Sequence, residues 1–217
     1  MTTNPLILIP QDTVIGYGRR EVARVAQPIE LGVGNHYLLA RNGRGKTTLL
    51  RTLARSLRPL RGEPRVEGRV QFIGEHLSFD PELPARTIFR SLLDGAARER
   101  AEEMAQTVEL DTGKPFARLS RGNRQKVMLV MAEQRATSSP SPILLLDEPF
   151  TGLDTHARER FLDHWMTHTT GILRLITTHP DHDGHDLLQP VVITEGVVRM
   201  ARADEGHLWG QLKTHLN

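Results

Sequence analysis

One segment constrains the fold of this chain more than any other: between residues 36 and 57 an apolar run, a glycine-rich loop and a leucine-rich stretch follow one another. The run HYLLA (36–40) has the length and composition of a buried strand, and the loop ARNGRGKTT follows it. Leucines then recur at helical spacing, at Leu49, Leu50, Leu53 and Leu57. We expect this helix to end near Pro59 and Gly62. The segment therefore predicts a strand, a loop and a helix, the repeating unit of α/β folds.

The glycine loop has the composition of a phosphate-binding loop. Small residues let backbone N–H groups close around a phosphate at a helix N-terminus, a lysine neutralises its β and γ oxygens, and a threonine hydroxyl ligates Mg²⁺. The full pattern requires glycine where this chain has Ala40, and the extra methyl group predicts a slightly strained loop. A glycine-rich turn before an ordinary helix is the alternative. The residues assigned to phosphate binding are Arg41, Asn42, Gly43, Arg44, Gly45, Lys46, Thr47 and Thr48.

Two adjacent carboxylates follow a second apolar run. The run ILLL (143–146) is typical of a buried strand, and Asp147 and Glu148 stand at its C-terminal end, where open α/β sheets place their ligands. We expect Asp147 to hold Mg²⁺ through water and Glu148 to polarise an attacking water. A core strand that ends in a solvated acidic turn is the alternative, and the glycine loop earlier in the chain makes it the weaker one.

The remaining sequence predicts further strands and helices around this unit. Short strands are expected within residues 1–35, a strand at 70–73, helices at about 96–108 and 122–135, a helix after residue 154, a strand at 172–178 and a hairpin at 191–200. We expect a single domain in which 1–35 form an antiparallel β part, 36–74 and 136–200 the core, 75–135 a helical insertion and 201–217 a C-terminal tail.

Composition excludes several classes of protein. The 217 residues allow one large domain. The absence of cysteine excludes a disulfide scaffold, a Cys-ligated metal site and a thiol nucleophile. No stretch approaches the roughly 18 apolar residues of a membrane span, and the start lacks the basic region of a secretory signal. Dispersed basic residues and only 5% aromatic residues argue against nucleic acid as a partner.

A third motif decides which family the chain resembles. LSRGNRQK (119–126) precedes a predicted helix, and with the glycine loop and the acidic pair it resembles the LSGGQ signature of ATP-binding cassette (ABC) ATPases. Other parts of that family's pattern follow in order: Tyr17 resembles the aromatic residue that stacks on adenine, TGLD (151–154) resembles the D-loop with Asp154, and LITTH (175–179) resembles the switch strand with His179. A plain strand aromatic and a surface histidine are the alternatives for Tyr17 and His179. The resemblance covers about residues 12 to 200.

The resemblance implies an α/β fold of the P-loop NTPase type with a RecA-like core, an antiparallel β subdomain at the N-terminus and an inserted α-helical subdomain. It also implies that two such domains dimerise head to tail around two ATP molecules. Ser120, Gly122 and Asn123 would then contact the γ-phosphate bound by the other subunit, at a helix N-terminus that favours an anion. Lys46, Glu148 and His179 would be the catalytic residues, Asp154 would contact nucleotide, and ATP and Mg²⁺ would be the cofactors.

This chain departs from the family pattern in two places. The position of the family's Q-loop glutamine falls in FIGEHLSFDPEL, where one loop length gives Glu75 and another gives His76. Glu75 would join Thr47 and Asp147 as a metal ligand, although its charge would repel phosphate. In the signature, Arg121 replaces the first glycine and Asn123 the glutamine. Arg121 either adds charge near the γ-phosphate or points outward, and we favour the second.

The function expected from the resemblance is that of an ATP-binding and ATP-hydrolysing subunit of an ABC transporter. It would form a homo- or heterodimer and drive transport through a transmembrane permease on a separate chain, with no role for nucleic acid. The short helical insertion and the RGNRQK form of the signature resemble small bacterial ATPases of the export type, so we expect export. It would be cytoplasmic, held at the inner face of the cell membrane by the permease. A non-transport ABC ATPase of the cofactor-assembly type and a subunit that only binds nucleotide are the alternatives; Ala40, Glu75 and Arg121 suggest the latter.

Overall fold

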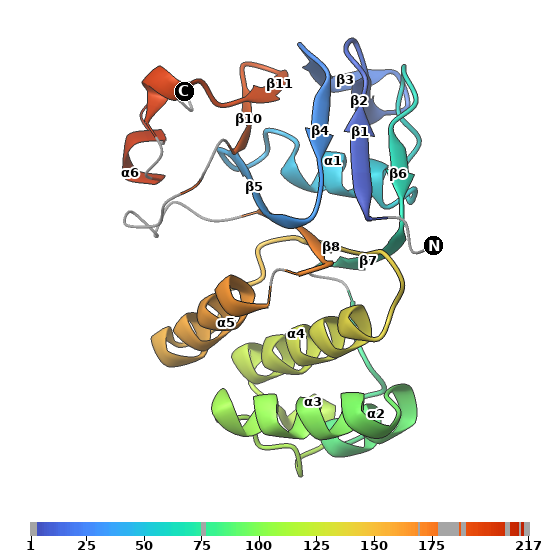
Figure 1. Ribbon diagram of the computed structural model, residues 1–217, viewed down its shortest axis with the longest axis vertical. Coiled ribbons are helices and arrows are strands. Elements are labelled where there is room, and N and C mark those ends of the chain that lie inside the picture. The colour runs from blue at the N-terminus through green and yellow to red at the C-terminus, as the bar shows by residue number, and fades with distance from the viewer. Residues whose placement is uncertain are drawn as a thin grey trace.

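A computed structural model describes most of the chain: residues 4–74, 77–168, 170–177, 187, 190–206, 209–212 and 214. Two sheets and a layer of helices make up this part of the molecule (Figure 1). Among the described helices, none is both long enough and apolar enough to cross a membrane.

The larger sheet has eight strands in the order β2-β3-β11-β10-β5-β9-β8-β7. Its strands are β2 (Val14–Tyr17), β3 (Arg20–Val25), β5 (Gly34–Ala40), β7 (Arg69–Ile73), β8 (Pro142–Leu146), β9 (Leu173–Thr177), β10 (Val191–Thr194) and β11 (Val197–Met200). The five neighbouring strands from β10 to β7 are parallel, so their carboxyl ends lie along one side of the sheet. The expected hairpin is confirmed, because β10 and β11 pair antiparallel.

The smaller sheet is antiparallel and has the strand order β4-β1-β6. It consists of β1 (Leu6–Ile9), β4 (Ile29–Leu31) and β6 (Arg65–Glu67). Strands from residues 1–35 thus divide between the two sheets, and the smaller sheet takes its third strand from beyond that range. This pairing joins residues distant in the chain, so the strand pattern of residues 1–35 does not reveal it.

Helix α1 (Lys46–Leu53) lies between the two sheets and buries three leucines, Leu49, Leu50 and Leu53, against their apolar faces (Figure 1). It ends well before Pro59, so the expected C-terminus of this helix is wrong. Arg55 adopts a left-handed backbone conformation with φ of 58°, and the amides of Ser56 and Leu57 both donate to the carbonyl of Arg51. These bonds satisfy the last turn and close the helix there.

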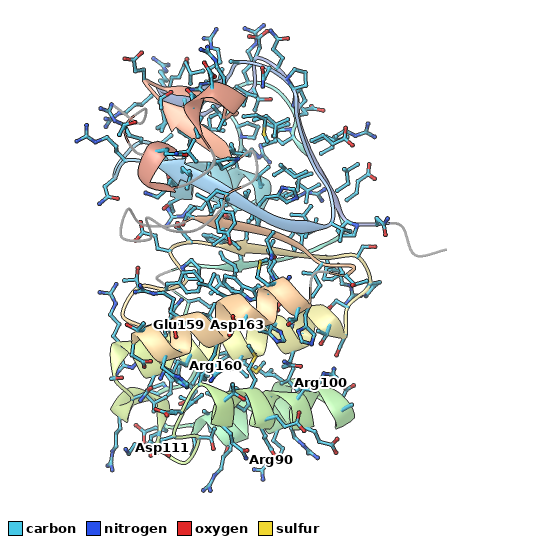
Figure 2. The ribbon with its side chains drawn as sticks, turned by 60° about the vertical axis from the view of Figure 1, so that its left-hand side comes forward. Arg90, Arg100, Asp111, Glu159, Arg160 and Asp163 are labelled. Carbon is cyan, nitrogen blue, oxygen red and sulfur yellow. The ribbon has the colours of Figure 1, made fainter. Side chains whose placement is uncertain are left out.

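The helical insertion lies on the opposite face of the larger sheet. It contains α2 (Ala85–Leu92), α3 (Gly95–Thr107), the short helix η1 (Phe116–Arg118) and α4 (Arg121–Thr137). Figure 1 shows α4 and α5 (Thr155–Thr167) next to the sheet, with α2 and α3 beyond α4. Leu144, Leu146 and Ile176 point toward these helices and form one apolar core with them. Charged side chains cover the outer faces of the layer, as Arg90 of α2 and Asp163 of α5 illustrate (Figure 2).

The last described part of the chain packs beside the hairpin strands. The last described elements are η2 (Ala203–Glu205) and α6 (Trp209–Leu212). A small apolar cluster joins Leu212 to Leu187 and to Leu39 and Val192 of the larger sheet. The mixed α/β fold with an antiparallel N-terminal sheet and a helical insertion is therefore confirmed.

Candidate functional site

The glycine loop lies at the carboxyl end of β5 and leads directly into α1. Gly43 and Gly45 have φ of 75° and 107°, a region that glycine adopts without strain. A Cβ on Gly45 would lie 2.7 Å from Val22 Cγ1, so a larger residue does not fit there. Ala40 ends β5 in a regular pairing with Ile193 of β10 and has no positive φ. The strain expected at Ala40 is therefore absent, because the tight turn falls on the two glycines.

Lys46 is buried at the start of α1 and reaches back over the loop. Its Nζ donates to the carbonyl O of Ala40 at 3.1 Å and to Asn42 Oδ1 at 3.4 Å. The same nitrogen lies 3.6 Å from Glu148 Oε1. The lysine thus holds the loop closed while its charge faces the acidic pair.

The acidic pair, Asp147 and Glu148, lies at the carboxyl end of β8, between the first turn of α1 and the last residue of β9. The hydroxyl of Thr47 donates to Asp147 Oδ2 at 2.6 Å, and the hydroxyl of Thr177 donates to Asp147 Oδ1 at 3.0 Å. The backbone N–H of Glu148 donates to Thr177 Oγ1 at 2.6 Å. Thr177 therefore fixes both carboxylate residues, although we did not single it out from the sequence. The sequence shows a polar residue at the end of the apolar strand before His179, but it does not show that this strand lies beside β8.

Glu148 occupies an unusual backbone conformation. Its φ is 49°, which costs a non-glycine residue of the order of 1–3 kcal/mol. The conformation turns the chain sharply after Asp147 and leaves the Glu148 side chain 36% exposed. Two hydroxyl groups thus hold the carboxylate of Asp147, whereas the carboxylate of Glu148 remains accessible to solvent and to a ligand.

The signature-like residues form the N-terminal end of α4. Ser120 is its N-cap, and the hydroxyl oxygen of Ser120 accepts a hydrogen bond from the backbone N–H of Asn123 at 3.2 Å. Gly122 packs so closely on the loop after Glu148 that a Cβ would lie 2.2 Å from the carbonyl O of Gly152. The glycine in this position is therefore required by packing within this chain.

Two more contacts join α4 to the D-loop-like segment. Gln125 Nε2 donates to the carbonyl O of Pro149 at 3.0 Å, and Lys126 Nζ lies 2.8 Å from Asp154 Oδ2. Asp154 is also the N-cap of α5 through the backbone N–H of Ala157. The hydrogen bond from Lys126 and then that from Ala157 lower the pKa of Asp154 below its ordinary value. Neither Gln125 nor Lys126 was predicted, because their partners are 24 and more residues away in sequence.

A cavity of about 450 Å³ lies between the acidic pair and α4. Its lining includes Thr47, Asp147 and Glu148 together with residues of α4 and of the segment before α2. Among the described residues, the lining consists of Thr47, Gly74, Leu77, Ser78, Phe116, Arg121, Arg124, Gln125, Met128, Asp147, Glu148 and Thr151. Arg121 and Arg124 give the α4 wall a positive charge opposite the acidic one, so Arg121 lines the cavity and does not point away from it as expected.

Other predicted residues lie apart from this cavity or outside the described part of the chain. Tyr17 ends β2 with 44% of its surface exposed, and its hydroxyl accepts a hydrogen bond of 3.5 Å from Arg51. Arg41 and Arg44 are exposed in the loop, and Thr48 is buried in α1. Glu75, His76 and His179 lie outside the described residues. Among the described residues, no cluster of three metal-binding side chains occurs.

Comparison with known protein families decides the classification. The family model described as "ABC transporter" matches residues 33–151, which is more than half of the chain. The chain belongs to the ABC transporter family. It is an ATP-binding subunit of an ABC transporter, that is, an ABC ATPase. Membership of this family implies ATP hydrolysis and membrane permease partners.

Curated relatives of this ABC ATPase have different named roles. The cytochrome c biogenesis ATP-binding export protein CcmA of Sphingopyxis alaskensis is 36% identical over 144 residues, 64% of this chain and 72% of that protein. The daunorubicin resistance ATP-binding protein DrrA3 of Streptomyces coeruleorubidus is 31% identical over 79% of this chain and 62% of that protein. A probable sulfate/thiosulfate import ATP-binding protein, CysA of Chlorella vulgaris, is 28% identical over 77% of this chain and 79% of that protein.

Solved structures support the fold of this ABC ATPase. An ATP-binding subunit of an ABC transporter superposes with a TM-score of 0.76 at 22% identity and covers 97% of this chain and 99% of that one. A bacterial Atm1-family ABC exporter with ATP bound also gives 0.76, at 18% identity, over 99% of this chain and 42% of that one. The second likeness spans less than half of the exporter, so it shows the fold of the ATPase part alone.

Proposed function

We propose that this ABC ATPase hydrolyses ATP at the glycine loop, with Lys46 and Glu148 as catalytic residues. The observation that carries the proposal is the convergence of Lys46, Thr47, Asp147 and Glu148 within hydrogen-bond or ion-pair distance at one edge of the sheet. A glycine loop at a helix N-terminus offers backbone donors to phosphate oxygens. Lys46 would neutralise β and γ oxygens once nucleotide competes with Glu148 for its charge.

The donor set of this site fits Mg²⁺. Thr47 and Asp147 present a hydroxyl and a carboxylate 2.6 Å apart, and Mg²⁺ binds oxygen ligands. Thr47 and Asp147 would hold the ion, which, when bound, would neutralise charge on the phosphates. The hydroxyl of Thr177 keeps Asp147 oriented through its other oxygen. Glu75, expected as a further ligand, stays a prediction from the sequence.

Glu148 is suited to act on the attacking water. Its position directly after Asp147 and its partial exposure place a carboxylate in the lining of the cavity, where it can orient a water and accept its proton. The positive φ and the N–H bond to Thr177 hold its backbone in place. His179 would contact the γ-phosphate by resemblance to the switch residue.

Ser120, Gly122, Asn123 and Asp154 would act across a head-to-tail dimer. The N-terminal end of α4 carries the positive end of the helix dipole, which favours a phosphate. Ser120 is exposed, so a second subunit can reach it. In this arrangement Tyr17, which is also exposed, stacks on the adenine ring.

The cargo pathway would lie in a separate permease subunit that holds this ABC ATPase at the inner face of the membrane. We propose export as the direction, because relatives such as CcmA are named as export proteins, whereas the CysA relative is named for import. Purification of the tagged protein from native membranes, followed by mass spectrometry, tests the partner. Recovery without any membrane protein would contradict a transport role.

The hydrolytic role is tested by Glu148→Gln. We expect steady-state phosphate release to fall about 100-fold or more, in the range found when a catalytic base is removed, while binding of a fluorescent ATP analogue stays close to that of the unmodified protein. Lys46→Ala is the matched control and should lose binding as well. Unchanged hydrolysis in Glu148→Gln would remove this residue from the catalytic role.

A further inference from the structure

Four elements that carry site residues at one end meet in a buried polar cluster at the other. Strand β5 ends at the glycine loop, β9 at Thr177, while α4 begins at Ser120 and α5 at Asp154. Away from the site, these elements contribute Asn35, Arg174, Glu133 and His164, which we call the anchor cluster. Each element is therefore held at both ends, at the site and at the anchor cluster.

The centre of the anchor cluster is a bidentate ion pair between α4 and β9. Arg174 Nε donates to Glu133 Oε1 at 3.0 Å, and Arg174 Nη2 donates to Glu133 Oε2 at 2.7 Å. Both side chains are buried, with exposures of 0% and 1%. The two parallel bonds fix the angle of the guanidinium plane as well as its distance from the carboxylate.

The other nitrogen of Arg174 connects the remaining elements. Nη1 donates to Asn35 Oδ1 of β5 at 3.2 Å and to the carbonyl O of His168, just beyond α5, at 3.1 Å. Asn35 Nδ2 in turn donates to the carbonyl O of Trp165 in α5 at 2.9 Å. His164 Nε2 of α5 lies 3.6 Å from Glu133 Oε2. One guanidinium thus links two strands and two helices.

A buried ion pair such as this one does not by itself indicate that the core needs it for stability. Arg174 occupies the same face of β9 as Ile176, which packs in the apolar core with α4 and α5. Replacement of a buried ion pair by apolar residues of similar volume is often neutral or stabilising. A charged pair does, however, restrict how one element sits against another, since both of its hydrogen bonds are lost after a small shift.

We propose that the anchor cluster is a positioning device for ATP hydrolysis. It fixes the position of α4 against β9, and it thereby fixes the N-cap residue Ser120 relative to Thr177 and the acidic pair. The proposal rests on the proposed function of this site. Glu133 and Arg174 act here as positioning residues, because they touch neither the cavity nor the acidic pair. Asn35 extends the same constraint to β5 and the glycine loop.

The discriminating variant is the apolar pair Glu133→Leu with Arg174→Met. Asn35 is half-buried and His168 is exposed, so water can replace the donors that these two residues lose. We expect the melting temperature to stay the same or rise, and kcat for ATP to fall about 10-fold with KM changed less than about threefold, because the catalytic geometry is displaced while nucleotide still binds.

A matched control exists elsewhere in the fold. Arg199 of β11 and Glu205 of η2 form a second bidentate pair, 17% and 11% exposed, that lies outside the four elements. Arg199→Met with Glu205→Leu makes the same chemical change and should leave kcat within about twofold. Equal losses of kcat in both double variants would overturn the proposal, since the effect would then belong to any lost ion pair.

A second measurement does not require hydrolysis. The chain has no cysteine, so spin labels at Arg118→Cys, just before α4, and at Val197→Cys of β11 report one distance without background labelling. We expect the distance distribution to broaden in the apolar double variant and to keep its width in the control. If the unmodified protein hydrolyses no ATP, the proposed function fails. The width of the distance distribution still shows whether the anchor cluster fixes the position of α4. An unchanged width overturns the inference, and if the double variant does not fold, the isosteric Glu133→Gln is measured in the same way.

Discussion

Among the glycines of the candidate site, Gly122 has the least room for a side chain. A Cβ would lie 2.2 Å from the carbonyl O of Gly152, so Gly122→Ala must push α4 away from the loop that follows Glu148. We expect the melting temperature to fall by about 5 °C and the ATPase rate by about 10-fold. Gly32→Ala is the control, since nothing lies within 4 Å of a Cβ there. A Gly122→Ala protein as stable and active as the control would show that α4 and the loop are not packed in this way.

Thr177 gives a second prediction for a single residue. Thr177→Val keeps the shape of the side chain but removes the donor to Asp147 Oδ1 and the acceptor for the N–H of Glu148. An unsatisfied group of this kind costs about 1–3 kcal/mol, and the misplaced acidic pair should lower kcat about 10-fold. Urea unfolding and phosphate release measure the two effects. Thr177→Ser should restore both, and a fully active valine variant would contradict the bridging role.

The sequence predicts the residues that face a ligand better than the residues that hold them in place. Lys46, Thr47, Asp147 and Glu148 could be found because a glycine loop and a strand end are local patterns with fixed spacing. Thr177 and Lys126 could not be found in that way, since their roles depend on which strand neighbours β8 and how closely α4 approaches the loop. Polar residues that hold a catalytic residue carry no spacing rule of their own.

The helices and strands that local sequence patterns determine are predicted well, whereas boundaries and pairings that depend on distant residues are not. Local patterns predict α3, α4, α5 and the hairpin well, because the residues that indicate each of them lie within the element itself or in its turn. The end of α1 depends on a left-handed Arg55 rather than on Pro59. The pairing of β6 with β1 joins residues about sixty positions apart, and no local pattern marks it.

Helix α4 carries a carboxylate whose ionisation should be visible in the acid stability of the protein. Burial raises the pKa of Glu133, but the neighbouring His164 and the hydrogen bonds and charge of Arg174 outweigh it, so the pKa lies below its ordinary value of 4.5. A carboxyl group with a lowered pKa stabilises the fold above the unfolded-state pKa and loses this contribution as the pH falls through the folded-state pKa.

Glu133→Gln removes that ionisation. We expect its free energy of unfolding in urea to fall less steeply than that of the unmodified protein below a pH of about 4.5, because one proton fewer is taken up on unfolding. His164, His168 and Arg174 surround this position and remain in both proteins. Glu99→Gln, on the exposed surface of α3, should leave the slope unchanged. Equal slopes in the two variants would show that Glu133 is not held ionised in the fold.

At the scale of the whole molecule, nucleotide should stabilise the fold in a way that depends on protein concentration. A ligand that binds only the folded state adds RT ln(1 + [L]/Kd), about 2.7 kcal/mol at a hundred times Kd. If two ATP molecules also join two subunits, as proposed for Ser120 and the glycine loop, a higher protein concentration should raise the melting temperature further. Glu148→Gln is suited to this measurement, since slow hydrolysis preserves the ATP.

The experiment compares thermal unfolding of Glu148→Gln with and without ATP and Mg²⁺ at two protein concentrations that differ about 50-fold. Lys46→Ala is the control. Its melting temperature should neither rise with ATP nor depend on protein concentration, because the glycine loop ARNGRGKTT loses its one lysine. The exposed Ser120 allows a further check, in which Ser120→Arg keeps the ATP shift but loses its dependence on concentration. An ATP shift identical at both concentrations would mean that one subunit binds the nucleotide without a partner, and the head-to-tail assignment of Ser120, Gly122 and Asn123 would then be wrong.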